Sequence, residues 1–248
     1  MGNLYVVATP IGNMQDITFR AVKILFEVDF ILAENSSKTS QFLTGLIQMF
    51  PNLTSNSKPE LIVFNEYEEI NKIPKVIALL EQGKNIALVS SAGTPLISDP
   101  GFKLVREAYK RRIKVISIPG PSSIIAALSS SPLPTDKFLF LGFLPRSSSK
   151  MKTSLRSLNE VLRVMQDKKM IPTVVIFESP HRLKFLLNEL LDTIGDINIV
   201  LGKELTKIYE NIELEKVSIF VDRFKSAKPK GEYIVLFNLK EQDSLLQD

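Results

Sequence analysis

The 248-residue sequence contains no cysteine and only one histidine. The absence of cysteine excludes disulfide bonds, thiolate zinc sites and cysteine nucleophiles. A single histidine is too few for a histidine-rich metal centre, and it disfavours catalysis by a histidine-based proton relay. We therefore expect no metal site, and a chemistry that makes little demand on acid–base groups.

The sequence also lacks long apolar runs. None approaches the roughly 20 residues that a membrane-spanning helix requires, and the opening MGNLYVVATP reaches a proline too early for a secretory signal. Hydrophobic residues nevertheless make up 44% of the chain, which is enough for well-buried cores. These features predict a cytoplasmic protein without a membrane partner, folded as one large domain or two of moderate size.

The common glycine motifs for phosphate binding are missing as well. No GxGxxG follows the first apolar run and no GxxxxGK[ST] occurs, which disfavours a dinucleotide site or a P-loop. Three other loops, ATPIGN (8–13), SSAGTPLISDPG (90–101) and IPGPSS (118–123), each follow an apolar run and precede a helix-like run. Because the carboxyl ends of parallel strands share one sheet edge, these loops predict a small-molecule site held mainly by main-chain groups.

Hydrophobic periodicity indicates an α/β fold with two domains. Residues 1–118 are expected to form a mainly parallel sheet, with strands at 4–8, 30–33, 61–64, 86–89 and 115–118 separated by helices. Residues 119–248 are expected to form a mixed sheet, with strands at 138–143, 173–177, 197–201 and 233–239 and helices near 123, 154–166, 183–191 and 217–224. Phe138, Phe140 and Phe143 are interpreted as core residues in preference to a base-stacking platform.

Basic residues outnumber acidic ones by 31 to 27, and they gather in three clusters. The clusters comprise Lys103, Arg106, Lys110, Arg111, Arg112 and Lys114, then Arg146, Lys150, Lys152 and Arg156, and finally Lys225, Lys228 and Lys230. Each is interpreted either as a solvated helix face or as a surface for a polyanion. The second cluster lies in PRSSSKMKTSLR (145–156), whose composition predicts a mobile segment unsuited to a core.

Several motifs together closely resemble the ribosomal RNA small-subunit methyltransferase I family, within the tetrapyrrole (corrin/porphyrin) methylase superfamily. They are LYVVATPIGN, ALVSSAGTPLISDPG, IPGPSS, LPTDKFLFLGFLPR, FESPHRL, GKELTK and KGEYIVLF, and they extend from residue 4 to about 239. The resemblance implies two α/β domains with S-adenosylmethionine in the cleft between them, and a homodimer. It further implies 2′-O-methylation of a cytidine in the RNA of the small ribosomal subunit.

The resemblance also points to individual residues at the cofactor, and the sequence offers further candidates at the substrate. The residues expected to approach the cofactor are Pro10, Ser91, Ala92, Gly93, Ile97, Ser122, Ser123, Phe177, Glu178 and Gly231. Glu66, followed by Glu34, is the carboxylate expected to handle substrate or its proton, the alternative being a surface or helix-capping acid. The residues expected to bind substrate are Asn13, Arg146, Lys150 and Lys203.

Four positions depart from the family pattern. The family usually reads AEDTR, HNE and SDAGTP, whereas this chain has Asn35, Ser37, Phe64 and Ser91 in place of Asp, Arg, His and Asp. These changes remove charge that serves to grip substrate or to assist the hydroxyl proton. Two alternatives therefore stay open: a methyltransferase of small tetrapyrroles, and a diverged RNA-binding paralogue with weak or no activity.

Overall fold

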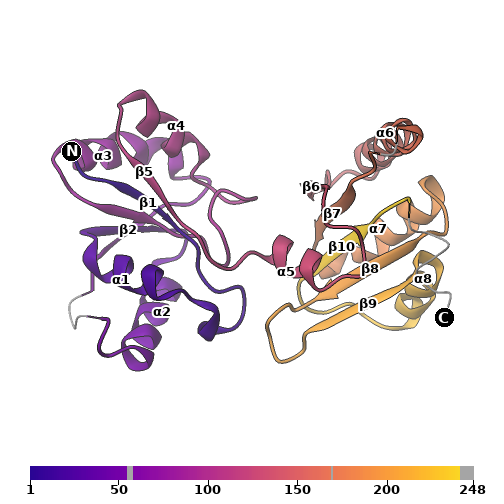
Figure 1. The fold of residues 1–248 in the computed structure, drawn as a ribbon, viewed down its shortest axis with the longest axis horizontal. Helices are drawn as coiled ribbons and strands as arrows, with labels where there is room; N and C mark the ends of the chain where they lie inside the picture. Colours follow the sequence, from indigo (N-terminus) through magenta and orange to yellow (C-terminus); the bar gives the residue numbers. More distant parts are fainter. Residues whose placement is uncertain (55–57, 169, 241–248) are drawn as a thin grey trace. The chain divides into compact units, whose positions relative to one another are not determined.

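The computed structural model describes residues 1–54, 58–168 and 170–240, and the chain divides into two compact units, Met1–Ser122 and Ser123–Asp248 (Figure 1). The first unit contains a five-stranded sheet of order β3-β2-β4-β1-β5, in which all neighbouring strands are parallel. Its elements are β1 (Leu4–Val7), η1 (Met14–Asp16), α1 (Phe19–Glu27), β2 (Phe30–Ala33), α2 (Ser36–Met49), β3 (Glu60–Val63), α3 (Glu69–Glu81), β4 (Ile86–Leu88), α4 (Phe102–Lys110) and β5 (Val115–Ile118). The predicted parallel sheet is confirmed.

Helices cover both faces of this first sheet. One core forms between the sheet and helices α1 and α2, and a second between the sheet and α3 and α4 (Figure 1). Side chains alternate along each strand, so Ile31 and Ala33 of β2 belong to the first core and Leu32 to the second. Burial on both faces explains why these strands are continuous apolar runs.

The second unit contains a five-stranded mixed sheet of order β6-β7-β10-β8-β9. Strand β6 is parallel to β7, and the other three pairs are antiparallel. The elements are α5 (Ser123–Ser129), β6 (Phe138–Phe143), α6 (Ser148–Asp167), β7 (Thr173–Glu178), α7 (Pro180–Thr193), β8 (Asn198–Lys203), β9 (Asn211–Lys216), α8 (Val217–Ser226) and β10 (Tyr233–Phe237). Residues of α6, α7 and α8 share one core with the sheet, and the predicted mixed sheet is confirmed.

The expectation of a mobile basic segment is wrong. Helix α6 begins at Ser148, inside PRSSSKMKTSLR, and Met151 and Leu155 are fully buried in the core of the second unit. The reason lies in the spacing of the apolar residues. Residues 151, 155, 158 and 162 are apolar at helical spacing and form one buried face. The basic side chains occupy the remaining surface of a regular helix.

Two further differences concern the edge strands of the second sheet. Strand β9 was not expected, because its run NIELEK contains only two apolar residues, and its alternating pattern was overlooked at this edge of the sheet. At the other edge, Phe138 and Phe143 of β6 are exposed and only Phe140 is half-buried, so the interpretation of all three as core residues is wrong. A residue on an edge strand has a neighbouring strand on one side only, which leaves its side chain accessible.

Within the described ranges, no helix is both long and apolar enough to span a bilayer. The same residues contain no group of three or more histidine, aspartate or glutamate side chains arranged to hold a metal ion.

Candidate functional site

The three predicted ligand loops leave the first sheet from the same side, at the carboxyl ends of its parallel strands. They follow β1, β4 and β5, and β1 lies between the other two strands and is parallel to both. Thr9 and Gly93 link the first two loops by reciprocal main-chain hydrogen bonds of 2.9 and 3.0 Å. The Thr94 hydroxyl donates to the Pro121 carbonyl oxygen at 3.0 Å and links the second loop to the third. The loops therefore form one connected structure.

The central loop has an unusual backbone. Gly93 has a φ of +78°, a conformation that favours glycine, and a Cβ there would lie 3.1 Å from Cγ2 of Ile11, so a larger residue would also require the Ile11 side chain to shift. Leu96 and Ser98 also have positive φ, at 72° and 66°, on either side of the exposed Ile97. Such conformations cost on the order of 1–3 kcal/mol each for residues other than glycine, and they concentrate at ligand sites.

Two carboxylates belong to this region, Glu34 beside the loop and Asp99 within it. Glu34 follows β2, and its Oε2 accepts hydrogen bonds from the hydroxyl and from the main-chain N–H of Ser91. The pKa of Asp99 is raised from its ordinary value of 3.8 to about 6, first by burial and second by the charge of Glu34, while a hydrogen bond from Ser90 acts in the opposite direction. The sequence analysis missed Asp99 because it expected the loop SSAGTPLISDPG to hold a ligand mainly by main-chain groups. An ionisable residue inside a loop of small residues was the available signal.

Glu66 occupies the same sheet edge but a different environment. It follows β3, the neighbour of β2, and is exposed on a turn held by the Asn65 side chain, which accepts from the N–H groups of Tyr67 and Glu68. Within the described part of the chain, Glu66 makes no hydrogen bond or ion pair through its side chain. The structure thus brings Glu34 to Ser91 and leaves Glu66 solvated.

The departures from the family pattern have local explanations. Asn35 caps α2 by accepting from the N–H of Lys38 at 3.0 Å, a role that aspartate fills equally well. Ser37 is exposed on the first turn of that helix, and Phe64 is fully buried in the second core. Asn13 similarly caps η1 by accepting from the N–H of Gln15.

Candidate residues of the second unit also gather where strands of its sheet end, at the carboxyl ends of β7 and β8. Tyr233, at the start of β10, lies opposite both Glu178 at the end of β7 and Lys203 at the end of β8. Phe177 and Gly231 are neighbours of these residues in the chain. Ser123 instead begins α5, a helix whose residues contact β10.

Gly231 has a structural requirement of its own. Its φ is +92°, and a Cβ there would lie 2.6 Å from Cγ of Glu204. The Glu204 carboxylate accepts from the N–H of Glu232 at 2.8 Å and from Nζ of Lys207 at 3.0 Å, and these two contacts lower its pKa in that order. Lys207 also pairs with Glu232 at 2.9 Å, so the GKELTK and KGEY motifs interlock.

The ESPHRL motif contains a buried ion pair. The Glu178 side chain has no exposed surface, and its Oε2 lies 3.3 Å from NH2 of Arg182. Burial raises the pKa of Glu178, against hydrogen bonds from Ser179 and the charge of Arg182. Arg182 additionally donates to the carbonyl oxygens of Leu144 and Pro145, at 2.8 and 3.1 Å. Arg182 was not among the residues singled out from the sequence, and it joins the end of β7 to the turn after β6.

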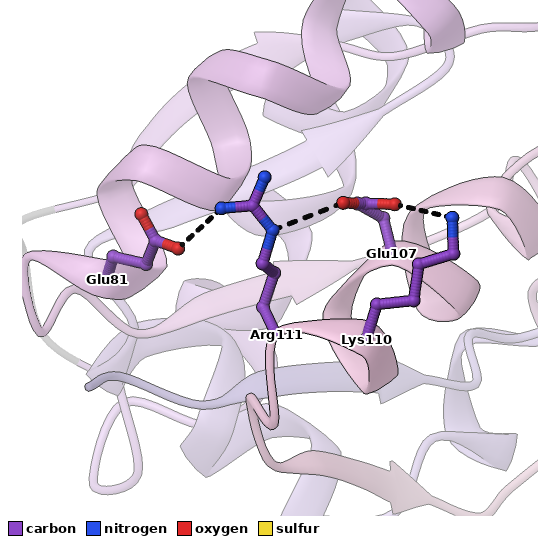
Figure 2. A network of polar contacts seen from close by, with 4 residues as sticks. All are labelled: Glu81, Glu107, Lys110 and Arg111. Carbon is purple, nitrogen blue, oxygen red and sulfur yellow. Dashed lines mark hydrogen bonds and ion pairs between the residues drawn. The ribbon is translucent and has the colours of Figure 1, made fainter.

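The basic clusters differ in how far their charge is compensated. At the end of α4, Arg111 lies between Glu81 and Glu107, and Glu107 also pairs with Lys110 (Figure 2). Lys103 pairs with the buried Glu69, whose carboxylate also accepts from two N–H groups at the start of α4. Arg146, Lys150 and Arg156 are exposed and, among the described residues, have no salt bridge. In the first cluster, Arg106, Arg112 and Lys114 are likewise exposed and without a salt bridge among the described residues, which is three of its six basic residues against three of four in the second. The second cluster therefore keeps the larger share of its charge available to a polyanion.

Comparison with known proteins assigns the family. The family of tetrapyrrole (corrin/porphyrin) methylases matches residues 3–218. This chain belongs to that family. It is 41% identical over 241 residues to the protein named ribosomal RNA small subunit methyltransferase I of Thermotoga maritima, an alignment that covers 97% of this chain and all of the relative. The protein of the same name from Halalkalibacterium halodurans is 38% identical, with 95% of this chain and 75% of the relative aligned.

Solved structures of family members share the fold. A uroporphyrin-III C-methyltransferase from Thermus thermophilus superposes with a TM-score of 0.63 at 17% identity, covering 95% of this chain and 97% of that one. The methyltransferase CobJ superposes with a TM-score of 0.65 at 13% identity, covering 96% and 95% of the two chains. At such low identity these neighbours establish the architecture, and the predicted fold class is confirmed.

Proposed function

We propose that this protein transfers a methyl group from S-adenosylmethionine to the 2′-hydroxyl of a cytidine ribose in the RNA of the small ribosomal subunit. The observation that carries the proposal is the similarity to relatives named ribosomal RNA small subunit methyltransferase I, which are 41% and 38% identical over 97% and 95% of this chain. We further propose that it acts as a homodimer in the cytoplasm, and that residues 1–118 and 119–248 are the two domains that together complete the cofactor site.

The residues available at the two sheet edges suit such a cofactor. A solved family member was crystallised with S-adenosyl homocysteine, the product that remains after methyl transfer from this cofactor. In the first unit, the linked loops place small residues and glycine at Pro10, Ser91–Gly93 and Ser122, which lets main-chain groups come close to a ligand. In the second unit, Phe177, Glu178 and Gly231 would complete the site. The Glu178 carboxylate is turned to Ser179 and Arg182, so this residue would contribute its main chain.

The reaction requires positioning more than acid–base chemistry. When bound, S-adenosylmethionine would supply a methyl group on a sulfonium, and its carbon–sulfur bond would break as the bond from carbon to the ribose oxygen forms. The task of the chain is to hold the hydroxyl in line with that bond, and such positioning accounts for a large part of the rate enhancement in two-substrate reactions. A sequence with one histidine suits this task.

The hydroxyl proton still needs an acceptor, and the first sheet edge offers three carboxylates. We assign this role to the pair of Glu34 and Asp99, with the exposed Glu66 binding substrate or assisting. The half-buried carboxyl of Asp99, whose pKa is raised to about 6, accepts a proton more readily near neutral pH than a fully solvated carboxylate. Replacing Glu34 or Asp99 by the amide is expected to lower kcat, whereas Glu66→Gln is expected to act mainly on KM.

We assign substrate binding to Asn13, Arg146, Lys150 and Lys203. Arg146 and Lys150 are exposed and basic, and RNA binding draws heavily on such contacts to phosphates. Lys203 lies at the same sheet edge as Glu178. Neutralising a phosphate contact is expected to weaken binding of the subunit and to reduce its dependence on salt.

The direct test is transfer of labelled methyl groups to small ribosomal subunits purified from a strain that lacks this protein, followed by mapping of the modified nucleotide. Label on a cytidine ribose supports the proposal, and label on a base contradicts the reaction type. Transfer to a tetrapyrrole but not to the subunit would favour the small-molecule alternative. Calorimetric titration with S-adenosylmethionine addresses the third possibility, because a non-catalytic RNA-binding protein would give no heat.

A further inference from the structure

Phe143 is an exposed aromatic residue at the predicted site. It is the last residue of β6, its exposed fraction is 55%, and its ring centroid lies 5.6 Å from that of Phe177. Phe177 also contacts Phe140, edge to face, at 4.8 Å. The Phe177 ring is therefore enclosed by two neighbours, whereas one side of the Phe143 ring stays open to solvent.

A β-bulge is what directs Phe143 to this position. Phe140 lies opposite Val175 and Phe143 opposite Phe177, so β6 uses three residue steps where β7 uses two. Because side chains alternate along a strand, a regular β6 would place Phe143 on the face opposite to Phe140. The extra residue restores both rings to the same face, and Gly142, with a φ of +62°, adopts the required backbone conformation.

The chain after Phe143 is held in place and then becomes basic. The carbonyl oxygens of Leu144 and Pro145 accept from Arg182, which also pairs with the buried Glu178. This contact fixes the turn between β6 and α6 relative to the end of β7, the neighbouring strand (Figure 1). Arg146 follows directly. It is exposed and without a salt bridge among the described residues, unlike Lys110 and Arg111, which are both paired (Figure 2).

We propose that Phe143 stacks on an unpaired nucleobase of the RNA substrate, while Arg146 binds an adjacent phosphate. The inference rests on the proposed function and names the side chain that recognises single-stranded substrate. Aromatic rings on accessible strands next to unpaired basic residues are the usual means of holding unstacked RNA bases. The rigid turn supports this role, since a preordered ring loses little freedom on binding.

The absence of tryptophan from the sequence allows a direct test. Phe143→Trp creates a protein with one tryptophan, whose fluorescence is expected to fall when small subunits or a single-stranded RNA of the target region are added. Phe138→Trp is the matched control, because Phe138 is an exposed residue of the same edge strand, 45% accessible, and is expected to show no quenching. Competition with unlabelled RNA should restore the signal at Phe143→Trp.

Kinetics give the second readout. Phe143→Ala is expected to raise KM for the subunit by roughly 5- to 100-fold with little change in kcat, from the usual value of one base–aromatic stack. Phe143→Tyr should restore most of the affinity and Phe143→Leu should not, because leucine is apolar but has no ring. Arg146→Gln should weaken binding and reduce its salt dependence.

Three results would overturn the inference. One is a Phe143→Ala variant with unchanged KM in an assay where the unmodified protein methylates subunits. Another is a loss of affinity for S-adenosylmethionine, measured calorimetrically, which would place Phe143 against the cofactor. The third is dissociation of a dimer in Phe143→Ala, measured by sedimentation, which would assign the ring to a second copy of the chain. If the unmodified protein itself transfers no methyl group to RNA, the proposed function fails first.

Discussion

The carboxylate of Glu34 accepts two hydrogen bonds from Ser91, one from its hydroxyl and one from its main-chain N–H at 3.3 Å. These residues follow β2 and β4, which are neighbours in the first sheet, so the contact joins two strand ends directly. Serine suits this position because it donates to a carboxylate, whereas the aspartate usual in the family cannot donate when ionised. The departure at Ser91 therefore creates a contact between the strand ends.

Ser91→Asp is expected to destabilise the protein near neutral pH. The new carboxylate would face Glu34 and lie near Asp99, and one such like-charge contact costs roughly 1 kcal/mol, or about 2–4 °C in Tm for a chain of this size. The loss should shrink as the carboxyl groups become protonated toward about pH 4. Ser91→Ala is the control, since it removes the donor without adding charge. Equal losses of Tm for the two variants at neutral pH would contradict the argument.

Asp99 should give the folded protein a specific dependence on pH. Its folded pKa is about 6 against an ordinary value of 3.8, so the folded state binds more protons than the unfolded state between these values. Stability contributed by this group therefore falls as pH rises through that window. Asp99→Asn is expected to raise Tm relative to the unmodified protein at about pH 7.5 more than at about pH 4.5. A difference in Tm that is constant with pH would show that Asp99 titrates normally.

Arg182→Ala is expected to cost roughly 3 kcal/mol of unfolding free energy, because it leaves Glu178 buried without its cation. Two main-chain acceptors, in Leu144 and Pro145, also lose their donor. Urea unfolding measures the change, and adding Glu178→Gln to Arg182→Ala should recover part of it by removing the uncompensated charge. Failure of the double variant to recover any stability would mean that the carbonyl contacts, and not the ion pair, carry the effect.

Comparing Gly231→Ala with Gly83→Ala separates the conformational cost of a side chain at positive φ from the cost of overpacking. Gly231 and Gly83 have similar φ, +92° and +91°, but a Cβ at Gly231 would lie 2.6 Å from Glu204 and a Cβ at Gly83 would have nothing within 4 Å. Gly83→Ala should therefore cost about 1 kcal/mol for conformation alone, and Gly231→Ala about 1–3 kcal/mol more for overpacking. Thermal unfolding tests this. The excess should diminish in Gly231→Ala combined with Glu204→Ala, and a persisting excess would point to another contact.

Much of the first unit follows from its sequence, because its strands are buried on both faces and alternate with amphipathic helices. The runs ending in ATPIGN, SSAGTP and IPGPSS are confirmed as parallel strands that meet at one edge. The contacts between the loops at these strand ends could not be predicted from the sequence. The links from Thr9 to Gly93 and from Thr94 to Pro121 depend on loop backbone angles, and periodicity carries no information on these.

The elements of the second unit were harder to predict from the sequence, because several of them lack a clear apolar pattern. Strand β9 and the exposed rings of β6 lie on sheet edges, where the apolar pattern is weak or, as with Phe143, altered by a bulge. The start of α6 was obscured because serines and lysines dominate its first turns, while only every third or fourth residue is apolar. Arg182 and Asp99 were overlooked because their importance arises from neighbours distant in sequence, or from burial.

The reciprocal hydrogen bonds between Thr9 and Gly93 involve peptide groups alone. A join of this kind is insensitive to most amino-acid replacements around it, since every residue except proline carries both partners. Evolution can thus exchange the side chains that surround the join, and so redirect an enzyme to a new acceptor molecule, without rebuilding the scaffold that holds the strand ends together.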